Sequence, residues 1–315
     1  MRPGILLTLA AFAATAITAC GANGSSAVSE NSTPVASATA EDSPLPSTPG
    51  AVTIGSANFP ESELLAYLYA GAMTARGVQV TVHAGIGERP AYLAALNDHS
   101  IGAVPEYTGA LLSFLHPATT AKTPNDVYNE LRTYAQGRDL AVGRYAAAQD
   151  VDTITVTRAT AARYHLQSIG DLKDVAPTLS LGAPAPFRTV PYGIPALKNI
   201  YGVTFGRFVP LPATGSIART TLVKGTVDAA DIFSTDPAIQ RDNLISLTDP
   251  QNIFAAENVV PVFRRDVLTQ PMADACAAVA THLTTSALAG LVTKVVDGVD
   301  PAAAATSWLA EEGIT

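Results

Sequence analysis

From residue 51 to the C-terminus, short apolar runs alternate with segments of helical periodicity, and this alternation most constrains the fold. Residues 51–55 have the character of a buried strand, and the leucines that follow Pro60 recur at helical spacing up to Arg76. Proline is well accommodated in a first helical turn, and Gly77 suits the end of the helix. Alternation of this kind indicates an α/β protein with mostly parallel sheets.

The same pattern continues along the chain. Strands are predicted at residues 78–82, 101–104, 140–144, 152–158, 227–233 and 259–263. Helices are predicted at residues 88–97, 108–115, 216–224, 271–296 and 301–311, with a further one beginning near residue 123. At 315 residues, two lobes are expected. Two such sheets in one chain place a ligand in the crevice between them, near the carboxyl ends of strands.

The first fifty residues differ in composition from the rest. Arg2 precedes an apolar run over residues 5–17, which is too short to span about 30 Å of hydrocarbon and fits a secretory signal. The run ends in Ile-Thr-Ala-Cys, which resembles the lipobox of bacterial lipoproteins. We therefore expect a signal peptide at residues 1–19 and, over residues 20–50, a lipidated Cys20 with a flexible Ser/Ala/Pro-rich linker. An ordinary cleaved signal with an incidental cysteine is the alternative.

Charge and motifs exclude several classes of function. The chain carries 19 Lys and Arg against 27 Asp and Glu, which disfavours nucleic acid as a partner. The sequence contains no GxxxxGK[ST] phosphate loop, no HExxH, no CxxC pair and no GxSxG, and its five histidines are scattered. We therefore expect neither an enzyme nor a bound cofactor or metal. Cys276 is expected to be a small core residue.

Three short stretches carry small, polar and aromatic residues where predicted strands end. They read GSANFPES at residues 55–62, VPEYTG at residues 104–109 and ADIFSTDP at residues 230–237. The first turns from a strand into a helix N-terminus, where exposed amides can meet a polar ligand group. The other two place an acid and an aromatic ring at a strand end. The structural alternative is that all three are capping turns, with Tyr107 on the surface.

Together and in this order, the three stretches resemble the ProX/OpuAC-like substrate-binding proteins of osmoprotectant ABC transporters, which bind glycine betaine, choline, carnitine and related compounds. The family pattern G-S-x-N-F-[TP]-E matches residues 55–61, P-E-Y-T-G matches residues 105–109, and D-x-[FY]-S-T-D matches residues 231–236. Residues 193–202 are similar to the family's G-x-P-G-L-K-K-x-Y-G run. The likeness covers nearly all of residues 51–312.

The resemblance implies a two-lobed periplasmic-binding-protein fold, a type II-like clamshell with two hinge crossings. Lobe one would comprise residues 51–149 and 237–315, and lobe two residues 150–236. The resemblance further implies a monomeric extracytoplasmic lipoprotein at the outer face of the cytoplasmic membrane. Such a protein delivers an osmoprotectant-like small molecule to an ABC permease, which a cytoplasmic ATPase powers. A lipoprotein sensor or scaffold that kept the clamshell and binds a non-betaine ligand is the alternative.

The family holds its trimethylammonium head in a cage of aromatic rings, and Tyr107 and Phe233 match cage positions. Other positions depart from the family pattern. Relatives have further aromatic residues where this chain has Thr153, Glu257 and Asn258, and they have Glu and Arg where it has Pro186 and Val190. That arginine pairs with the betaine carboxylate in relatives, and Arg188 lies two residues away as a substitute. We therefore expect a neutral or larger ligand, such as an aromatic or polyol-like solute. The candidate ligand-binding residues are Asn58, Phe59, Glu61, Glu106, Tyr107, Arg188, Asp231, Phe233, Glu257 and Asn258.

Overall fold

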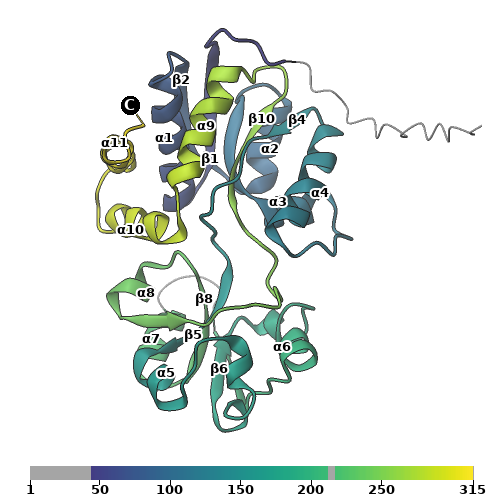
Figure 1. The fold of residues 1–315 in the computed structure, drawn as a ribbon, viewed down its shortest axis with the longest axis vertical. Helices are drawn as coiled ribbons and strands as arrows, with labels where there is room; N and C mark the ends of the chain where they lie inside the picture. The colour runs from purple at the N-terminus through teal and green to yellow at the C-terminus, as the bar shows by residue number, and fades with distance from the viewer. Residues whose placement is uncertain (1–43, 212–216, 315) are drawn as a thin grey trace, which may run out of the picture. The chain divides into compact units, whose positions relative to one another are not determined.

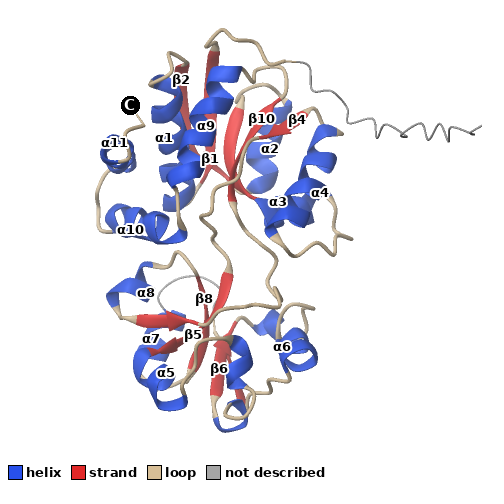
Figure 2. Cartoon of the chain, in the orientation of Figure 1, coloured by secondary structure: helices blue, strands red, loops and turns tan. Residues whose placement is uncertain are grey.

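The computed structural model describes residues 44–211 and 217–314. The expected signal peptide, Cys20 and the linker up to residue 43 lie outside the described residues. Within the compact unit that begins at Pro44, two five-stranded sheets are each covered by helices (Figures 1 and 2).

The first sheet has the strand order β2-β1-β3-β10-β4. Strands β1, β2 and β3 are parallel, whereas β10 is antiparallel to both β3 and β4. The strands are β1 (Ala51–Ala57), β2 (Gln79–Gly87), β3 (Ala103–Tyr107), β4 (Leu140–Val142) and β10 (Val259–Arg264). The helices of this lobe are α1 (Pro60–Thr74), α2 (Arg89–Asn97), α3 (Thr108–Leu115), α4 (Pro124–Gln136), α9 (Gln270–His282), α10 (Thr285–Val296) and α11 (Pro301–Glu311).

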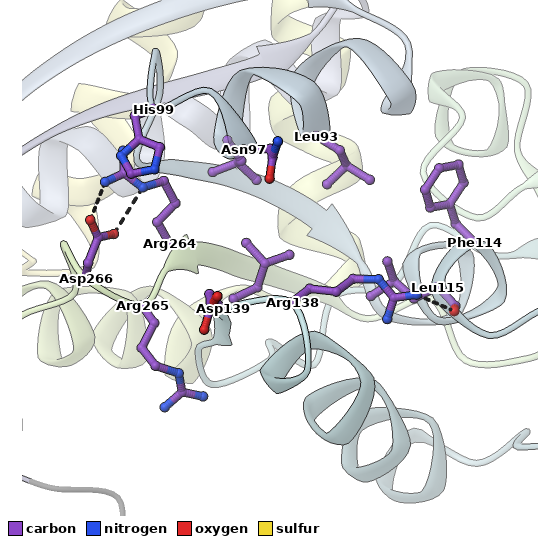
Figure 3. Close-up of a pocket in the computed structure, with 12 residues that line it drawn as sticks. Leu93, Asn97, His99, Phe114, Leu115, Arg138, Asp139, Arg264, Arg265 and Asp266 are labelled. Atoms are coloured by element: carbon purple, nitrogen blue, oxygen red, sulfur yellow. Dashed lines mark hydrogen bonds and ion pairs between the residues drawn. The ribbon is translucent and has the colours of Figure 1, made fainter.

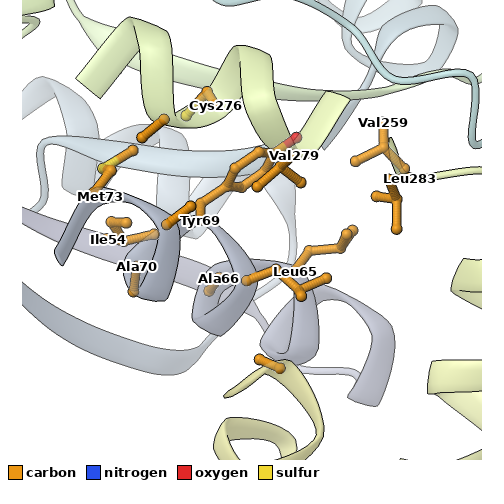
Figure 4. Packing of buried hydrophobic residues seen from close by; sticks show 14 of the residues in the cluster. Ile54, Leu65, Ala66, Tyr69, Ala70, Met73, Val259, Cys276, Val279 and Leu283 are labelled. Carbon is orange, nitrogen blue, oxygen red and sulfur yellow. The ribbon is translucent and has the colours of Figure 1, made fainter. Parts of the chain in front are cut away.

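Apolar cores lie on both faces of this sheet, because successive side chains of a strand point to opposite faces. On one face α1, α9, α10 and α11 pack in a cluster that includes Tyr69 and Cys276, both buried (Figure 4). Cys276 is thus the small core residue expected from the sequence. On the other face, α2, α3 and α4 pack against β3 and β10. Within the described residues no single helix is long and apolar enough to cross a membrane, and α9 and α10 meet that test only as a pair bent by 97°.

The second sheet repeats the arrangement of the first, with the strand order β7-β6-β8-β5-β9. Here β6 is parallel to β7 and β8, and β5 is antiparallel to β8 and β9. The strands are β5 (Asp152–Thr157), β6 (Ser180–Ala183), β7 (Arg207–Pro210), β8 (Ala229–Phe233) and β9 (Leu244–Ser246). The helices are α5 (Arg158–Tyr164), α6 (Ile194–Tyr201), α7 (Ile217–Val223) and α8 (Pro237–Arg241), with short 3₁₀ turns at Ile169–Leu172, Ala176–Thr178 and Ala185–Arg188.

Two chain segments connect the lobes, one between β4 and β5 and one between β9 and β10 (Figure 1). They run side by side: Gln149 and Asn258 form an isolated antiparallel bridge, and the Asp150 amide donates to the Glu257 carbonyl at 3.1 Å. The sequence predicted that the chain returns to lobe one at residue 237. Sheet membership places the return later, because β9 pairs with β5, with Ser246 opposite Thr155.

Residues 234–236, where the return to lobe one was predicted, contact the first crossing segment but remain part of lobe two. The Ser234 amide donates to the Val151 carbonyl at 2.9 Å. Asp236 then caps α8, since its side chain accepts from the Ala238 amide, and α8 leads back to the edge strand β9.

Candidate functional site

The first two sequence motifs meet at one hydrogen bond. Tyr107 is the last residue of β3, and its phenol donates to Glu61 Oε1 at 2.7 Å. Glu61 lies in the first turn of α1 and is buried, at 5% exposure. Ser62 fastens this turn to β1, because its Oγ accepts from the Ala57 amide at 3.0 Å. The end of β3 and the start of α1 are therefore held together by the polar residues that made both stretches conspicuous.

The third motif joins the same group from lobe two. The Thr235 hydroxyl donates to Asp150 Oδ1 at 2.6 Å, and Asp150 lies on the first crossing. The Ser234 hydroxyl donates to the Gln149 carbonyl at 2.9 Å and accepts from the Val151 amide at 3.0 Å. Residues 234 and 235 thus attach the end of β8 to the crossing segment.

Glu61 and Asp150 are two carboxyls in one buried region, and their titration reflects it. Burial, with the charge of Asp150 as the second cause, raises the pKa of Glu61 to about 8. The Tyr107 and Thr235 side chains oppose that rise through hydrogen bonds. Burial also raises the pKa of Asp150, and it raises the pKa of Tyr107 well above its ordinary value. Burial therefore favours the protonated form of Glu61 and the neutral form of the Tyr107 phenol.

Next to this group lies a cavity of about 540 Å³, lined by residues of both lobes. Four aromatic rings line it: Tyr107, Tyr192, Phe233 and Phe254. Three acidic side chains also line it: Asp150, Asp152 and Glu257. Within the described part of the chain, the only positively charged side chain in its lining is Lys122, whose Nζ donates to the Ile253 carbonyl at 3.2 Å. The remaining lining residues are Ala110, Ser113, Pro117, Thr119, Ala121, Val151, Pro191 and Ala255.

Glu257 is held at the start of α3. Its Oε2 accepts from the Ala110 amide at 2.8 Å. The close approach requires glycine at position 109, since a Cβ there would lie 2.7 Å from the Ala256 carbonyl oxygen and 2.8 Å from Glu257 Oε1. Burial raises the pKa of Glu257 to about 8, although the Ala110 amide and the Arg89 charge both oppose the rise.

Asp152 and Asp231 form a second pair of carboxyls, on lobe two. In the antiparallel pairing of β5 with β8, Asp152 stands opposite Phe233 and Ile154 stands opposite Asp231. Asp152 and Asp231 are therefore diagonal neighbours on one face of the sheet. Burial, followed by the charge of Asp150, raises the pKa of Asp152 to about 6. Burial, followed by the charge of Asp152, raises the pKa of Asp231 to about 8.

Several residues proposed from the sequence lie outside the cavity lining. Glu106 is 1% exposed and is committed to Arg89, at 2.8 and 3.0 Å, and to the Tyr92 phenol, at 2.7 Å. Asn258 is buried and donates to the Ala146 carbonyl at 2.8 Å. Arg188 does not line the cavity either, because its guanidinium lies 4.5 Å from the centre of the Phe208 ring.

The first motif contributes to the site indirectly. Asn58 is exposed, and Phe59 stacks on the Tyr107 ring with the ring centres 6.4 Å apart. Neither residue lines the cavity, and Glu61 is next to it through its interactions with Tyr107 and Asp150, which do. Of the ten candidate residues, those in the lining are Tyr107, Phe233 and Glu257.

The sequence comparison missed two of the four rings. Tyr192 follows the 3₁₀ turn at Ala185–Arg188, and Phe254 lies between β9 and β10, so both are in irregular segments without periodicity. The cavity therefore has more aromatic rings than the sequence led us to expect. Among the described residues that line the cavity, the basic side chain is that of Lys122.

A larger cavity of about 730 Å³ lies elsewhere on lobe one (Figure 3). It is near the start of β4 and the end of β10, and Arg138 and the ion pair of Arg264 with Asp266 border it. None of the three motif stretches contributes to its lining, so it is not the candidate site. Within the described residues, no group of three metal-ligating side chains is present.

Comparison with known proteins gives a consistent result. A family model described as the substrate-binding domain of an ABC-type glycine betaine transport system matches residues 50–311. The chain is 26% identical over 278 residues to the glycine betaine-binding protein YehZ of Escherichia coli, covering 84% of this chain and 91% of the relative. It is 23% identical over 224 residues to a glycine-betaine-binding protein of Pseudomonas aeruginosa, covering 68% and 72%.

Solved structures show the same fold. A structure described as a glycine betaine/carnitine/choline ABC transporter matches with a TM-score of 0.77 at 21% identity, covering 84% of this chain and 99% of that one. The apo structure of YehZ from Escherichia coli matches with a TM-score of 0.73 at 24% identity, with the same coverage. The two-lobed binding-protein fold expected from the sequence is confirmed.

Proposed function

Since the chain belongs to the family of substrate-binding domains of ABC-type glycine betaine transport systems, we propose that it captures an organic cation in the 540 Å³ cavity for delivery to an ABC permease. The cation is of the quaternary ammonium kind. The observation that carries this proposal is the lining itself: four aromatic rings and three acidic side chains against one lysine.

Both components of the lining favour a diffuse positive charge. The negative face of an aromatic ring attracts a quaternary ammonium without requiring hydrogen bonds, by about 2 kcal/mol when the site is desolvated. A nearby carboxylate adds Coulomb attraction, which grows as water is excluded. The neutral, polyol-like ligand expected from the sequence would leave these carboxyls without an ionic partner. The cavity therefore supports a cation better than a neutral solute.

Capture and release follow from the two crossings. A ligand that contacts residues of both lobes favours the arrangement in which both sets of contacts are made, because it shifts the population toward that state. We propose that a monomer tethered through lipidated Cys20 presents this state to the permease at the outer face of the membrane. The protein performs no catalytic step in this account, and the permease's ATPase supplies the energy.

Calorimetric titration of the purified protein tests the proposal with a matched pair of probes. Choline is a trimethylammonium alcohol, and 3,3-dimethyl-1-butanol is its neutral carbon isostere. Choline should bind at least tenfold more tightly, because only the cation gains the ring and carboxylate attraction. Equal affinity for the two probes would refute a cation site.

Removal of one ring tests the lining. Tyr192→Ala deletes an exposed ring from the cavity and should weaken choline binding about tenfold, or about 1.4 kcal/mol. Phe114→Ala is the matched control, because it deletes an exposed ring from the larger cavity of Figure 3 and should leave choline affinity unchanged.

A further inference from the structure

We infer that Asp152 and Asp231 act as a selectivity filter that disfavours carboxylate-bearing ligands, so that the cavity prefers cationic alcohols to zwitterionic betaines. This inference rests on the proposed function and specifies the ligand class of the same cavity. It concerns the lobe-two side of the cavity, which β5, β8 and the segment before α6 provide.

The geometry of this side begins with the strand pairing. Asp152 and Phe233 are cross-strand partners, so their side chains leave the same face of the sheet, and both line the cavity. Asp231 lies diagonally behind them, next to Ile154. An aromatic ring and a carboxyl are thus presented together, with a second carboxyl immediately below.

The hydrogen-bonding capacity of the Asp231 carboxyl is not fully used. Its Oδ1 is buried and has no hydrogen-bond partner among the described residues. A buried carboxyl oxygen without a partner is costly and calls for a physical reason. Its immediate surroundings supply another carboxyl, Asp152, rather than a cation. A positively charged ligand lying on Asp152 would provide the missing compensation for the pair.

Tyr192 shows that carboxyls of both lobes approach one point of the cavity. Asp152, Asp231 and Glu257 all act on its phenol and, after burial, raise its pKa. Asp152 and Asp231 belong to lobe two, whereas Glu257 lies beside α3 of lobe one. Carboxyls of both lobes therefore lie near enough to the Tyr192 phenol to act on it.

A ligand carboxylate would find no matching partner on this side. Binding proteins recognise carboxylates best through the paired donors of an arginine. The guanidinium of Arg188 is instead stacked on Phe208, outside the lining. Lys122 belongs to the segment between α3 and α4, on the lobe-one side. A betaine whose head lies on the rings would thus bring its carboxylate against Asp152 without a compensating charge, which is unfavourable.

The test compares choline with glycine betaine, which differ in whether the chain ends in a hydroxyl or a carboxylate. The wild-type protein should bind choline at least tenfold more tightly in calorimetric titration at pH 8.5, where the carboxyls of Asp152 and Asp231, with pKa values of about 6 and about 8, are mostly ionised. Asp152→Asn keeps the size of the side chain and removes its charge. It should reduce the preference at least threefold, by weakening choline and strengthening glycine betaine. Asp174→Asn removes an exposed charge from the same lobe outside the cavity and should leave the preference unchanged.

The outcomes separate a failure of the selectivity filter from a failure of the cation site. Equal or tighter binding of glycine betaine by the wild-type protein overturns the filter but leaves the cation site standing. A change of the same factor for both ligands in Asp152→Asn also overturns it, since a mere loss of packing or general attraction would act on both. If neither ligand binds more tightly than the neutral isostere, both the proposed function and the filter fail. Asp231→Asn provides a second variant, with the same expected direction as Asp152→Asn.

Discussion

At the scale of single residues, the structure separates carboxyls that maintain the fold from carboxyls that face the ligand. Glu106 belongs to the P-E-Y-T-G stretch, yet its carboxylate accepts hydrogen bonds from Arg89 and Tyr92 and is almost fully buried. Asp152 belongs to no motif, yet it lines the cavity. Motif membership alone therefore does not distinguish the two roles, whereas hydrogen-bond partners do.

Glu106→Gln tests the structural role. The substitution leaves the partly exposed Arg89 without its ionic partner, and it should lower the free energy of unfolding by about 2 to 4 kcal/mol. Choline affinity of the folded protein should change by less than threefold. Urea unfolding and calorimetric titration of the variant check both statements, with the exposed Glu88→Gln as the control. A large loss of affinity with unchanged stability would assign Glu106 to the ligand instead.

The raised pKa values predict opposite pH responses for the two probes. Asp152, near 6, and Asp231, Glu61 and Glu257, near 8, gain protons as the pH falls from 8.5 to 5.5. The other charged or titratable groups around them include Asp150, Tyr107, Tyr192, Lys122, and the ion pair of Arg89 with Glu106 beside Glu257. Protonation removes negative charge, so choline affinity should fall with the pH, while the preference for choline over glycine betaine narrows.

Calorimetry in two buffers of different ionisation enthalpy checks the same linkage. A bound cation favours the ionised carboxyls, so choline binding at pH 7.5 should release protons to the buffer. A choline affinity that stays constant over this pH range, with no proton release, would contradict the cation site.

At the scale of elements, the sequence was most informative where periodicity is strong. Helix 108–115 was predicted with the bounds that α3 has, and the helix that begins at Pro60 matches α1 to within its last turn. Strand 101–104 was placed too early, since β3 runs over Ala103–Tyr107 and thus includes Glu106 and Tyr107. The short edge strands β7 and β9 were missed, because three or four residues carry too little pattern.

The cavity-lining residue of β5 is one position away from the residue that the family comparison singled out. The family comparison aligned Thr153 with a cage position, but alternate residues of a strand face opposite sides. Thr153 instead donates to the Ile232 carbonyl at 2.7 Å, and Asp152 is the residue that lines the cavity. In the sequence, the spacing of Asp150 and Asp152, two residues apart at the crossing, was the available indication that acidic side chains face the cavity there. Tyr192 and Phe254 had none, since tertiary packing alone brings those irregular segments to the cavity.

The junction of β3 and α3 gives a prediction at this scale. Gly109→Ala places a methyl group against the Ala256 carbonyl and Glu257, and it should destabilise the protein by about 1 to 3 kcal/mol. Gly290→Ala, in α10 with open space around its Cβ position, is the control and should stabilise slightly or have no effect. Urea unfolding compares them, and equal stability of the two variants would contradict the close packing at Gly109.

At the scale of the whole molecule, the two sheets share one strand order. In each sheet the antiparallel fourth strand, β10 or β5, is the one that arrives from the other lobe. This arrangement brings both crossings beside the cavity, where Asp150 and Glu257 lie. The family resemblance predicted the two lobes. The position at which the chain returns to lobe one follows instead from the pairing of β9 with β5.

A ligand that contacts both lobes should slow backbone hydrogen exchange in both lobes. Hydrogen exchange with saturating choline should slow at the end of β3, around Tyr107, and also around Tyr192 and Phe233. The helices of the lobe-one core shown in Figure 4 serve as the internal reference. Protection restricted to one lobe would contradict binding across the two.

The most direct test of the central claim is a crystal structure of the protein with choline. The quaternary nitrogen should lie within about 6 Å of the centres of the cavity rings, Tyr107, Tyr192, Phe233 and Phe254, and should face the carboxyl of Asp152. Choline bound in the larger cavity bordered by Arg138 and Arg264, or bound with its nitrogen away from these rings, would contradict it.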